Sequence, residues 1–169
     1  MTKKAFIHVL YTYNLAEFAR YLVSSDWSIL SANKTLDFLE KENIPVTKES
    51  ALVENNQYTL ETCQLIQRIL ETKTSEEGEP EEELDNIYLV CMNVYPKYDA
   101  INSEQELNKV CKPVNYYHTT VIKNAVYNYQ NVLVITDPDD YKEVMCELRI
   151  GSIKPDFRGY WVGLALNLL

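Results

Sequence analysis

Residues 87–92 read Ile-Tyr-Leu-Val-Cys-Met, the most continuously apolar run of the chain. A short apolar run without polar alternation is typical of a strand that is buried on both faces. Such strands occur in parallel sheets whose two faces are covered by helices. These six residues therefore predict the central strand of an α/β domain.

Short apolar runs alternate with longer amphipathic segments on both sides of this strand. This alternation is typical of βα units that build a parallel sheet. We therefore predict a three-layer, doubly wound α/β fold with a mostly parallel sheet of about five strands. The predicted strands are residues 5–10, 27–32, 45–47, 87–92 and 131–136, and the predicted helices are residues 15–23, 33–42, 58–70, 104–112, 119–129, 141–149 and 157–169.

The length and composition fit one domain spanning residues 1–169. The chain has 169 residues, of which 46% are hydrophobic, which is enough for one sizeable core. Residues 72–85 contain six glutamates around Gly78 and Pro80. So many like charges cannot build a core, and we predict a mobile, solvated loop there.

Charge and cysteine usage narrow the classes of partner. The chain carries 16 basic and 25 acidic side chains, a formal charge of −9, which disfavours nucleic acid as a partner. The apolar run after the N-terminus is too short for a membrane span or a signal peptide, so we expect a cytoplasmic protein without membrane contact. No metal site, disulfide framework or cofactor is expected from the widely spaced Cys63, Cys91, Cys111 and Cys146.

Four motifs follow one another along the chain: residues 15–19 (LAEFA), 44–47 (IPVT), 93–96 (NVYP) and 132–141 (VLVITDPDDY). In order and spacing they resemble the V-E-F-A, G-I-P-V-T, N-L-Y-P-F and V-x-V-V-x-D-P-x-D-Y motifs of the inosine-monophosphate (IMP) cyclohydrolase domain of bifunctional purine-biosynthesis enzymes. The resemblance covers nearly the whole chain. It implies a methylglyoxal-synthase-like fold and a relation to purine nucleotide biosynthesis.

Two turns of this family differ here. The family's D-K-T-G turn is replaced by residues 11–14 (YTYN), its S-G-G-T turn by residues 32–35 (ANKT), and no glycine precedes Gly78. Glycine lets a backbone approach a phosphate closely, so we expect phosphate affinity to be weakened or redirected. The resemblance implies that the ligand-binding residues are Tyr11, Thr12, Ser31, Asn33, Lys34 and Thr35.

The catalytic groups of the family are mostly absent. Its K-T-L-H-P motif has no counterpart in this chain. Its D-I-G-G…R-A-A-A-K-N segment aligns with residues 115–128. In this alignment Asn115 replaces the aspartate, Tyr117 and His118 replace the two glycines, and Tyr127 replaces the lysine. Asparagine cannot take a proton and tyrosine carries no positive charge. The resemblance implies Tyr95, Asn115 and His118 as the candidate catalytic residues, with catalysis impaired.

The histidines and the tyrosines can each be interpreted as structural or as functional residues. His8 lies in a strand and His118 near a helix start, and neither has a nucleophile and an orienting partner beside it in the sequence. We interpret both as structural histidines, with His118 the better functional candidate. The many tyrosines near the family's pocket either fill a former substrate cavity or stack on a planar ligand.

Two function classes therefore stay open. The chain is either a divergent IMP-cyclohydrolase-like enzyme with impaired catalysis, or a non-catalytic module that senses a nucleotide or binds a protein partner. The expected ligand is a purine nucleoside monophosphate or another phosphate-bearing small molecule.

We expect segments 11–14, 31–35, 93–95 and 115–118 to converge at the carboxyl ends of the strands. The apolar tail is interpreted as core packing, with a homodimer contact as the alternative.

Overall fold

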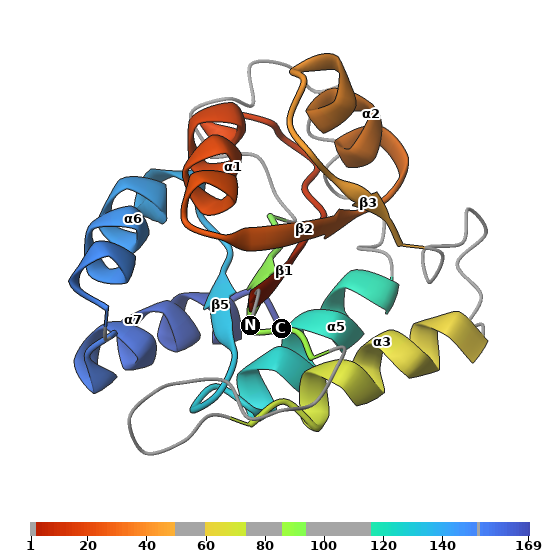
Figure 1. Ribbon diagram of the computed structural model, residues 1–169. Coiled ribbons are helices and arrows are strands. Elements are labelled where there is room, and N and C mark those ends of the chain that lie inside the picture. Colours follow the sequence, from red (N-terminus) through yellow and green to blue (C-terminus); the bar gives the residue numbers. More distant parts are fainter. Residues whose placement is uncertain (1–2, 50–59, 74–85, 94–115, 152) are drawn as a thin grey trace, which may run out of the picture.

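The sheet has five strands, and every pair of neighbours is parallel. The computed structural model describes residues 3–49, 60–73, 86–93, 116–151 and 153–169 (Figure 1). The strand order is β3-β2-β1-β4-β5. The predicted parallel α/β sheet is confirmed. The strands are β1 (Lys3–Ile7), β2 (Trp27–Ser31), β3 (Thr47–Lys48), β4 (Leu89–Cys91) and β5 (Leu133–Ile135).

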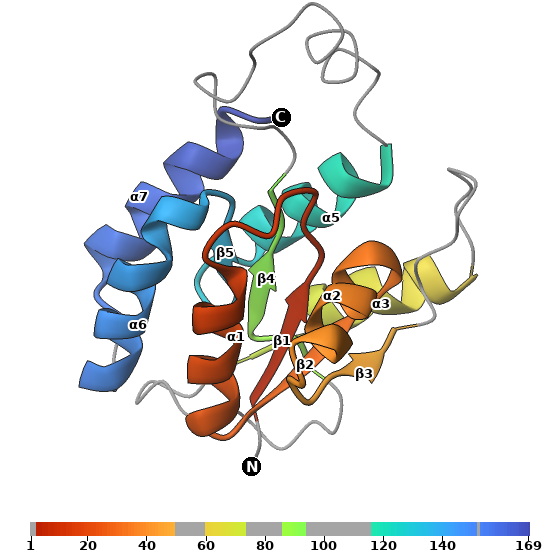
Figure 2. The same ribbon diagram turned by 90° about the horizontal axis from the view of Figure 1, so that it is seen from above.

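Helices cover both faces of this sheet, as predicted. Figure 2 shows α1 and α6 on one face and α3 and α5 on the other, with α7 beside β5. The short 3-10 helix η2 (Pro138–Asp140) leads into α6, and Gly151 ends α6 with a φ of 88°. The helices are α1 (Leu15–Ser24), α2 (Asn33–Lys41), α3 (Leu60–Leu70), α5 (Tyr116–Tyr127), α6 (Tyr141–Ile150) and α7 (Pro155–Leu166).

Alternating side chains of the strands feed two separate cores. In β1, Ala5 and Ile7 pack with α1 and α6, whereas Phe6 packs with α3 and α5. Successive strand residues point to opposite faces, so a central strand must be apolar on both. Helix α7 contributes Trp161 to the first core and Ala165 to the second. This agrees with the interpretation of the C-terminal tail as core packing.

Two of the expected segments lie wholly or mostly outside the described residues. These are the helix at 104–112 and residues 74–85 of the acidic segment. At the start of that segment, Thr72 is buried, and its hydroxyl donates to the carbonyls of Arg68 and Ile87. It also accepts a hydrogen bond from the Ile87 N–H. Thr72 thus joins the end of α3 to the chain that enters β4.

Asparagine occupies three left-handed backbone positions in the first half of the chain. The φ values of Asn14, Asn33 and Asn43 are 56°, 52° and 54°. Among residues with a Cβ atom, asparagine and aspartate tolerate this region best. Glycine is the usual choice there. The chain therefore makes glycine-like turns although its first 77 residues contain no glycine.

Membrane insertion through a helix finds no support in the described part of the chain. No helix there combines the length and apolar character needed to cross a bilayer.

Asn43 offers a test of these left-handed turns because its side chain is exposed, directly after α2. We expect Asn43→Ala to lower the free energy of unfolding by about 1 kcal/mol, since alanine tolerates a positive φ less well. The melting temperature should fall by roughly 2–4 °C in a domain of this size. Asn43→Gly is the matched control and should be as stable as the wild type. Equal melting temperatures for all three proteins would contradict this account.

Candidate functional site

The polar residues of interest gather where the connections of the sheet reverse direction. From β1 the chain continues to β2 on one side, whereas β4 pairs with β1 on the other side and leads to β5. In open parallel sheets, ligands bind outside the carboxyl ends of the strands at such a reversal. Residues 8–14, 31–35 and 92–93 follow β1, β2 and β4 at this edge.

The side chain of Asn93 joins the loop after β1 to the end of β4. Its Oδ1 accepts hydrogen bonds from the N–H groups of Leu10 at 2.8 Å and Tyr11 at 3.0 Å. Its Nδ2 donates to the Tyr11 carbonyl at 2.8 Å. Asn93 is buried, so these bonds are shielded from water. One side chain therefore fixes the course of the chain that follows β1.

Ser31 and Thr35 join the next turn to the same strand end. The Ser31 hydroxyl donates to the Ile7 carbonyl at 2.7 Å. Thr35 Oγ1 donates to the Val9 carbonyl and accepts from the Val9 N–H, both at 3.0 Å. Both hydroxyls are buried. Segments 31–35 and 8–11 are thereby held side by side, and these two hydroxyls have structural partners within the protein.

The other residues expected to bind a ligand are exposed at this edge. Tyr11, Thr12, Asn33 and Lys34 all face solvent. Contacts at this edge join Tyr11 to Asn93, Ser31 and Thr35 to the chain that leaves β1, and His118 to His8. Tyr95 and Asn115 lie outside the described residues.

The three left-handed asparagines coincide with glycines of the family that the sequence resembles. In that alignment, glycine ends D-K-T-G at position 14, follows the serine of S-G-G-T at position 33 and opens G-I-P-V-T at position 43. The positive φ at Asn14, Asn33 and Asn43 keeps the backbone conformation that glycine favours. The side chains of these asparagines occupy space that glycine leaves open.

An aromatic cluster lies at the first turn of α5, with His8 and His118 buried and Tyr117 partly buried. The rings of His8 and His118 stack with a centroid distance of 5.0 Å and an interplanar angle of 25°. Tyr117 meets both rings edge-on, at 6.3 Å from His8 and 5.9 Å from His118. From the sequence, the two histidines were interpreted separately. Their pairing depends on α5 packing over the end of β1, which no local pattern reveals.

Tyr127 does not belong to this cluster. It lies at the opposite end of α5 from His118 and is 84% exposed. The position that the resemblance aligns with the family's lysine is therefore on the surface in this chain.

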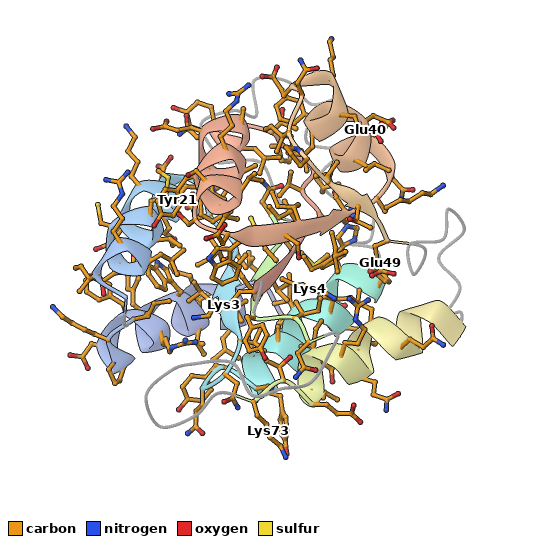
Figure 3. All side chains as sticks on the ribbon, in the orientation of Figure 1. Lys3, Lys4, Tyr21, Glu40, Glu49 and Lys73 are labelled. Carbon is orange, nitrogen blue, oxygen red and sulfur yellow. The ribbon has the colours of Figure 1, made fainter. Side chains whose placement is uncertain are left out.

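His8 is uncharged at neutral pH. Its pKa is lowered to about 4, mainly by burial and then by the nearby His118, against the opposing effect of a hydrogen bond to the Ala32 backbone. Burial, followed by the neighbouring Glu49, raises the pKa of Tyr117. Figure 3 shows Glu49 after β3, near the start of α5, and its carboxylate pairs with Arg68 at 2.7 Å. His8 and Tyr117 thus offer hydrogen-bonding groups but no cation for a phosphate.

Cys91 and Tyr141 lie on the other side of the sheet and suit a structural role. The Cys91 thiol donates to the Tyr141 hydroxyl at 3.3 Å, and burial raises the pKa of Cys91 to about 12. A thiol with this pKa is not a nucleophile at neutral pH. In the described ranges, no three His, Cys, Asp or Glu side chains are grouped to hold a metal ion.

The fold and this edge define a parallel α/β domain whose polar residues gather at the reversal of the sheet. The crystal structure of ForH has the same fold, with a TM-score of 0.70 and 21% sequence identity, over 99% of this chain and 93% of that one. No protein-family model matches the chain.

Sequence relatives are more specific. The chain is 25% identical to the bifunctional purine biosynthesis protein PurH of Brachyspira hyodysenteriae, over 99% of this chain and 35% of that protein. It is 28% identical to PurH of Clostridium beijerinckii, over 88% of this chain and 31% of that protein. The chain therefore spans about a third of these relatives. The resemblance to the IMP cyclohydrolase domain is confirmed.

The hydrogen bonds of Asn93 predict a measurable loss of stability. We expect Asn93→Ala to lower the free energy of unfolding by about 1 kcal/mol or more, because partly buried backbone groups of Leu10 and Tyr11 lose their side-chain partner. Urea denaturation measures this loss. Asn93→Asp keeps an acceptor for the two N–H groups and should retain part of the stability. An alanine variant as stable as the wild type would show that Asn93 does not hold the loop.

The lowered pKa of His8 predicts a specific loss of stability in acid. The unfolded chain binds this proton near pH 6.5 and the folded chain near pH 4, so stability falls as the pH drops between these values. The difference is on the order of 3 kcal/mol. His8→Gln cannot take up the proton, so its stability should fall less between pH 7 and 4 when both proteins are compared by urea denaturation. Parallel pH profiles would contradict the assignment.

Proposed function

We propose that this chain is an IMP-cyclohydrolase-like domain of purine nucleotide metabolism that binds a purine nucleoside monophosphate and has impaired catalysis. The observation that supports binding is the pair of left-handed turns at Asn14 and Asn33, at the carboxyl ends of β1 and β2. Hydrogen bonds between Thr35 and Val9 hold the chain segments of these turns together.

The start of α2 suits the phosphate. Its first backbone hydrogen bond runs from the Leu36 N–H to the Ala32 carbonyl, so the N–H groups of residues 33–35 precede the helical ladder. Such groups, together with the helix dipole, favour an anion. Lys34 adds a positive charge at the same turn and is exposed. In this proposal the backbone and Lys34 bind the phosphate, while Ser31 and Thr35 shape the turn.

Impaired catalysis follows from the chemistry of ring closure. A carboxamide nitrogen attacks a formyl carbon and water is lost, which requires close positioning, donors for a developing oxyanion and proton transfer. At positions where the family has small or charged groups, this chain has His118, Asn115 and Tyr127. Loss of one oxyanion donor costs on the order of a hundredfold to a thousandfold in rate.

One observation favours the non-catalytic alternative, a nucleotide-sensing module. His8 and Tyr117 are uncharged at neutral pH where an acid, a base or a cation would be needed for fast ring closure. The impaired cyclohydrolase-like enzyme and the nucleotide-sensing module would share the nucleotide site, and they would differ in whether the substrate is converted to IMP.

Calorimetry with IMP and a turnover assay test the proposal together. We expect the wild type to bind IMP and to convert the formylated carboxamide ribonucleotide to IMP more slowly than about 1 s⁻¹, the low end of ordinary enzymes. Lys34→Ala should weaken IMP binding several-fold because a charge near the phosphate is lost. Lys41→Ala, at the other end of α2, is the matched control and should bind normally. Absence of IMP binding would refute the site, and turnover near 1 s⁻¹ or above would refute impaired catalysis.

A further inference from the structure

The buried ring of His8 has one nitrogen, Nδ1, for which the described residues supply no hydrogen-bond partner. His8 is 9% exposed, and its Nδ1 is shielded from solvent without a hydrogen bond in the described part of the protein. The ring bonds to the backbone of Ala32, and this bond raises the pKa, which identifies the ring as the donor and the carbonyl as the acceptor. Because Nδ1 has no partner, the donor is Nε2. Nδ1 therefore carries a lone pair.

The neighbours of His8 fix its orientation. His118 stacks against it at 5.0 Å, Phe6 lies nearly parallel at 6.4 Å, and Tyr117 approaches edge-on. Together with the bond to Ala32, these contacts restrict rotation of the ring. A buried acceptor without a donor costs folding free energy, and native proteins satisfy nearly all such groups.

The position of His8 is where a ligand is expected. The residue directly follows β1, and its backbone N–H donates to the Cys91 carbonyl of β4, so it lies at the reversal of the sheet. Ala32, the acceptor of its ring, directly precedes the turn that the proposed function assigns to the phosphate. In the family alignment His8 occupies the first serine of S-x-S-D-K-T-G, so a larger group with a fixed acceptor stands in place of a hydroxyl.

We propose that His8 Nδ1 accepts a hydrogen bond from an N–H or O–H group of the nucleoside part of the bound nucleotide, with His118 as a positioning residue. This inference rests on the proposed function and adds to it the orientation of the ligand. A neutral nitrogen lone pair repels a fully ionised phosphate, which has no proton to donate. The base or the ribose, and not the phosphate, therefore meets His8.

Two substitutions separate ligand recognition from structural support. His8→Gln keeps a donor near the position of Nε2, and therefore the bond to Ala32, but removes the acceptor at Nδ1. His8→Asn places an amide oxygen near the position of Nδ1 and loses the bond to Ala32. We expect His8→Gln to fold normally and to bind IMP roughly tenfold or more weakly. His8→Asn should bind IMP within about threefold of the wild type but melt at a lower temperature.

Ring-nitrogen NMR observes the atom itself. The chain has only two histidines, so a sample labelled with ¹⁵N-histidine is simple to assign with the His8→Gln variant. We expect the Nδ1 signal of His8 to be that of an unprotonated, unbonded nitrogen in the free protein. On saturation with IMP it should move toward the value of a hydrogen-bonded nitrogen, whereas inorganic phosphate should leave it unchanged.

The failures of the two proposals are distinguishable. If the wild type does not bind IMP, the proposed function falls, and the inference falls with it. If IMP binds while His8→Gln binds it equally well, or the Nδ1 signal does not move, the inference alone is overturned. A Nδ1 signal that is already hydrogen-bonded in the free protein would assign an internal water to this nitrogen and overturn the inference too. A response to inorganic phosphate would place the phosphate at His8, contrary to the proposed orientation.

Discussion

After β1 the backbone keeps some bonds to the backbone of β4 but takes many of its hydrogen bonds from side chains, and the site is built around this requirement. Backbone N–H and C=O groups that are buried must find partners. Beyond Ile7 the ladder between β1 and β2 ends, and Ser31, Thr35 and Asn93 supply partners from three other segments. Segments distant in the sequence are therefore brought to one edge of the sheet by the same bonds that complete the central strand.

The fold was predictable because its signals are local. The run at residues 87–92 predicted a central strand, and β4 pairs with both β1 and β5. Element ends were less predictable. Residues 8–10 continue the apolar pattern of β1, yet the strand ends at Ile7 because side chains take over its hydrogen bonds. Apolar periodicity does not report which atom accepts a backbone hydrogen bond.

The site was predictable only in part, because its contacts cross long stretches of sequence. The resemblance identified segments 11–14 and 31–35, and the structure brings them together. It could not reveal that His8 and His118 stack, since 110 residues separate them. One signal was present: the two-residue period of β1 places His8 on the same side as Phe6, facing α5. Nor did the sequence show that Asn14 and Asn33 adopt a positive φ, although their alignment with glycines indicated such positions.

The two halves of this edge differ in chemistry, and this difference gives the site a direction. Toward α2 it offers backbone N–H groups and Lys34, which favour an anion. Toward α5 it offers the uncharged rings of His8 and Tyr117, where an anion would lose its hydration without gaining a counter-charge from either ring. A nucleotide has the same asymmetry, with a charged phosphate at one end and a neutral heterocycle at the other. The proposed placement, with the phosphate at the turn of Asn33 and the nucleoside against His8, pairs each end of the ligand with the matching half of the site. Under the same proposal, impaired catalysis need not abolish recognition, because proton transfer requires groups that titrate near neutral pH, whereas binding requires only that donors face acceptors.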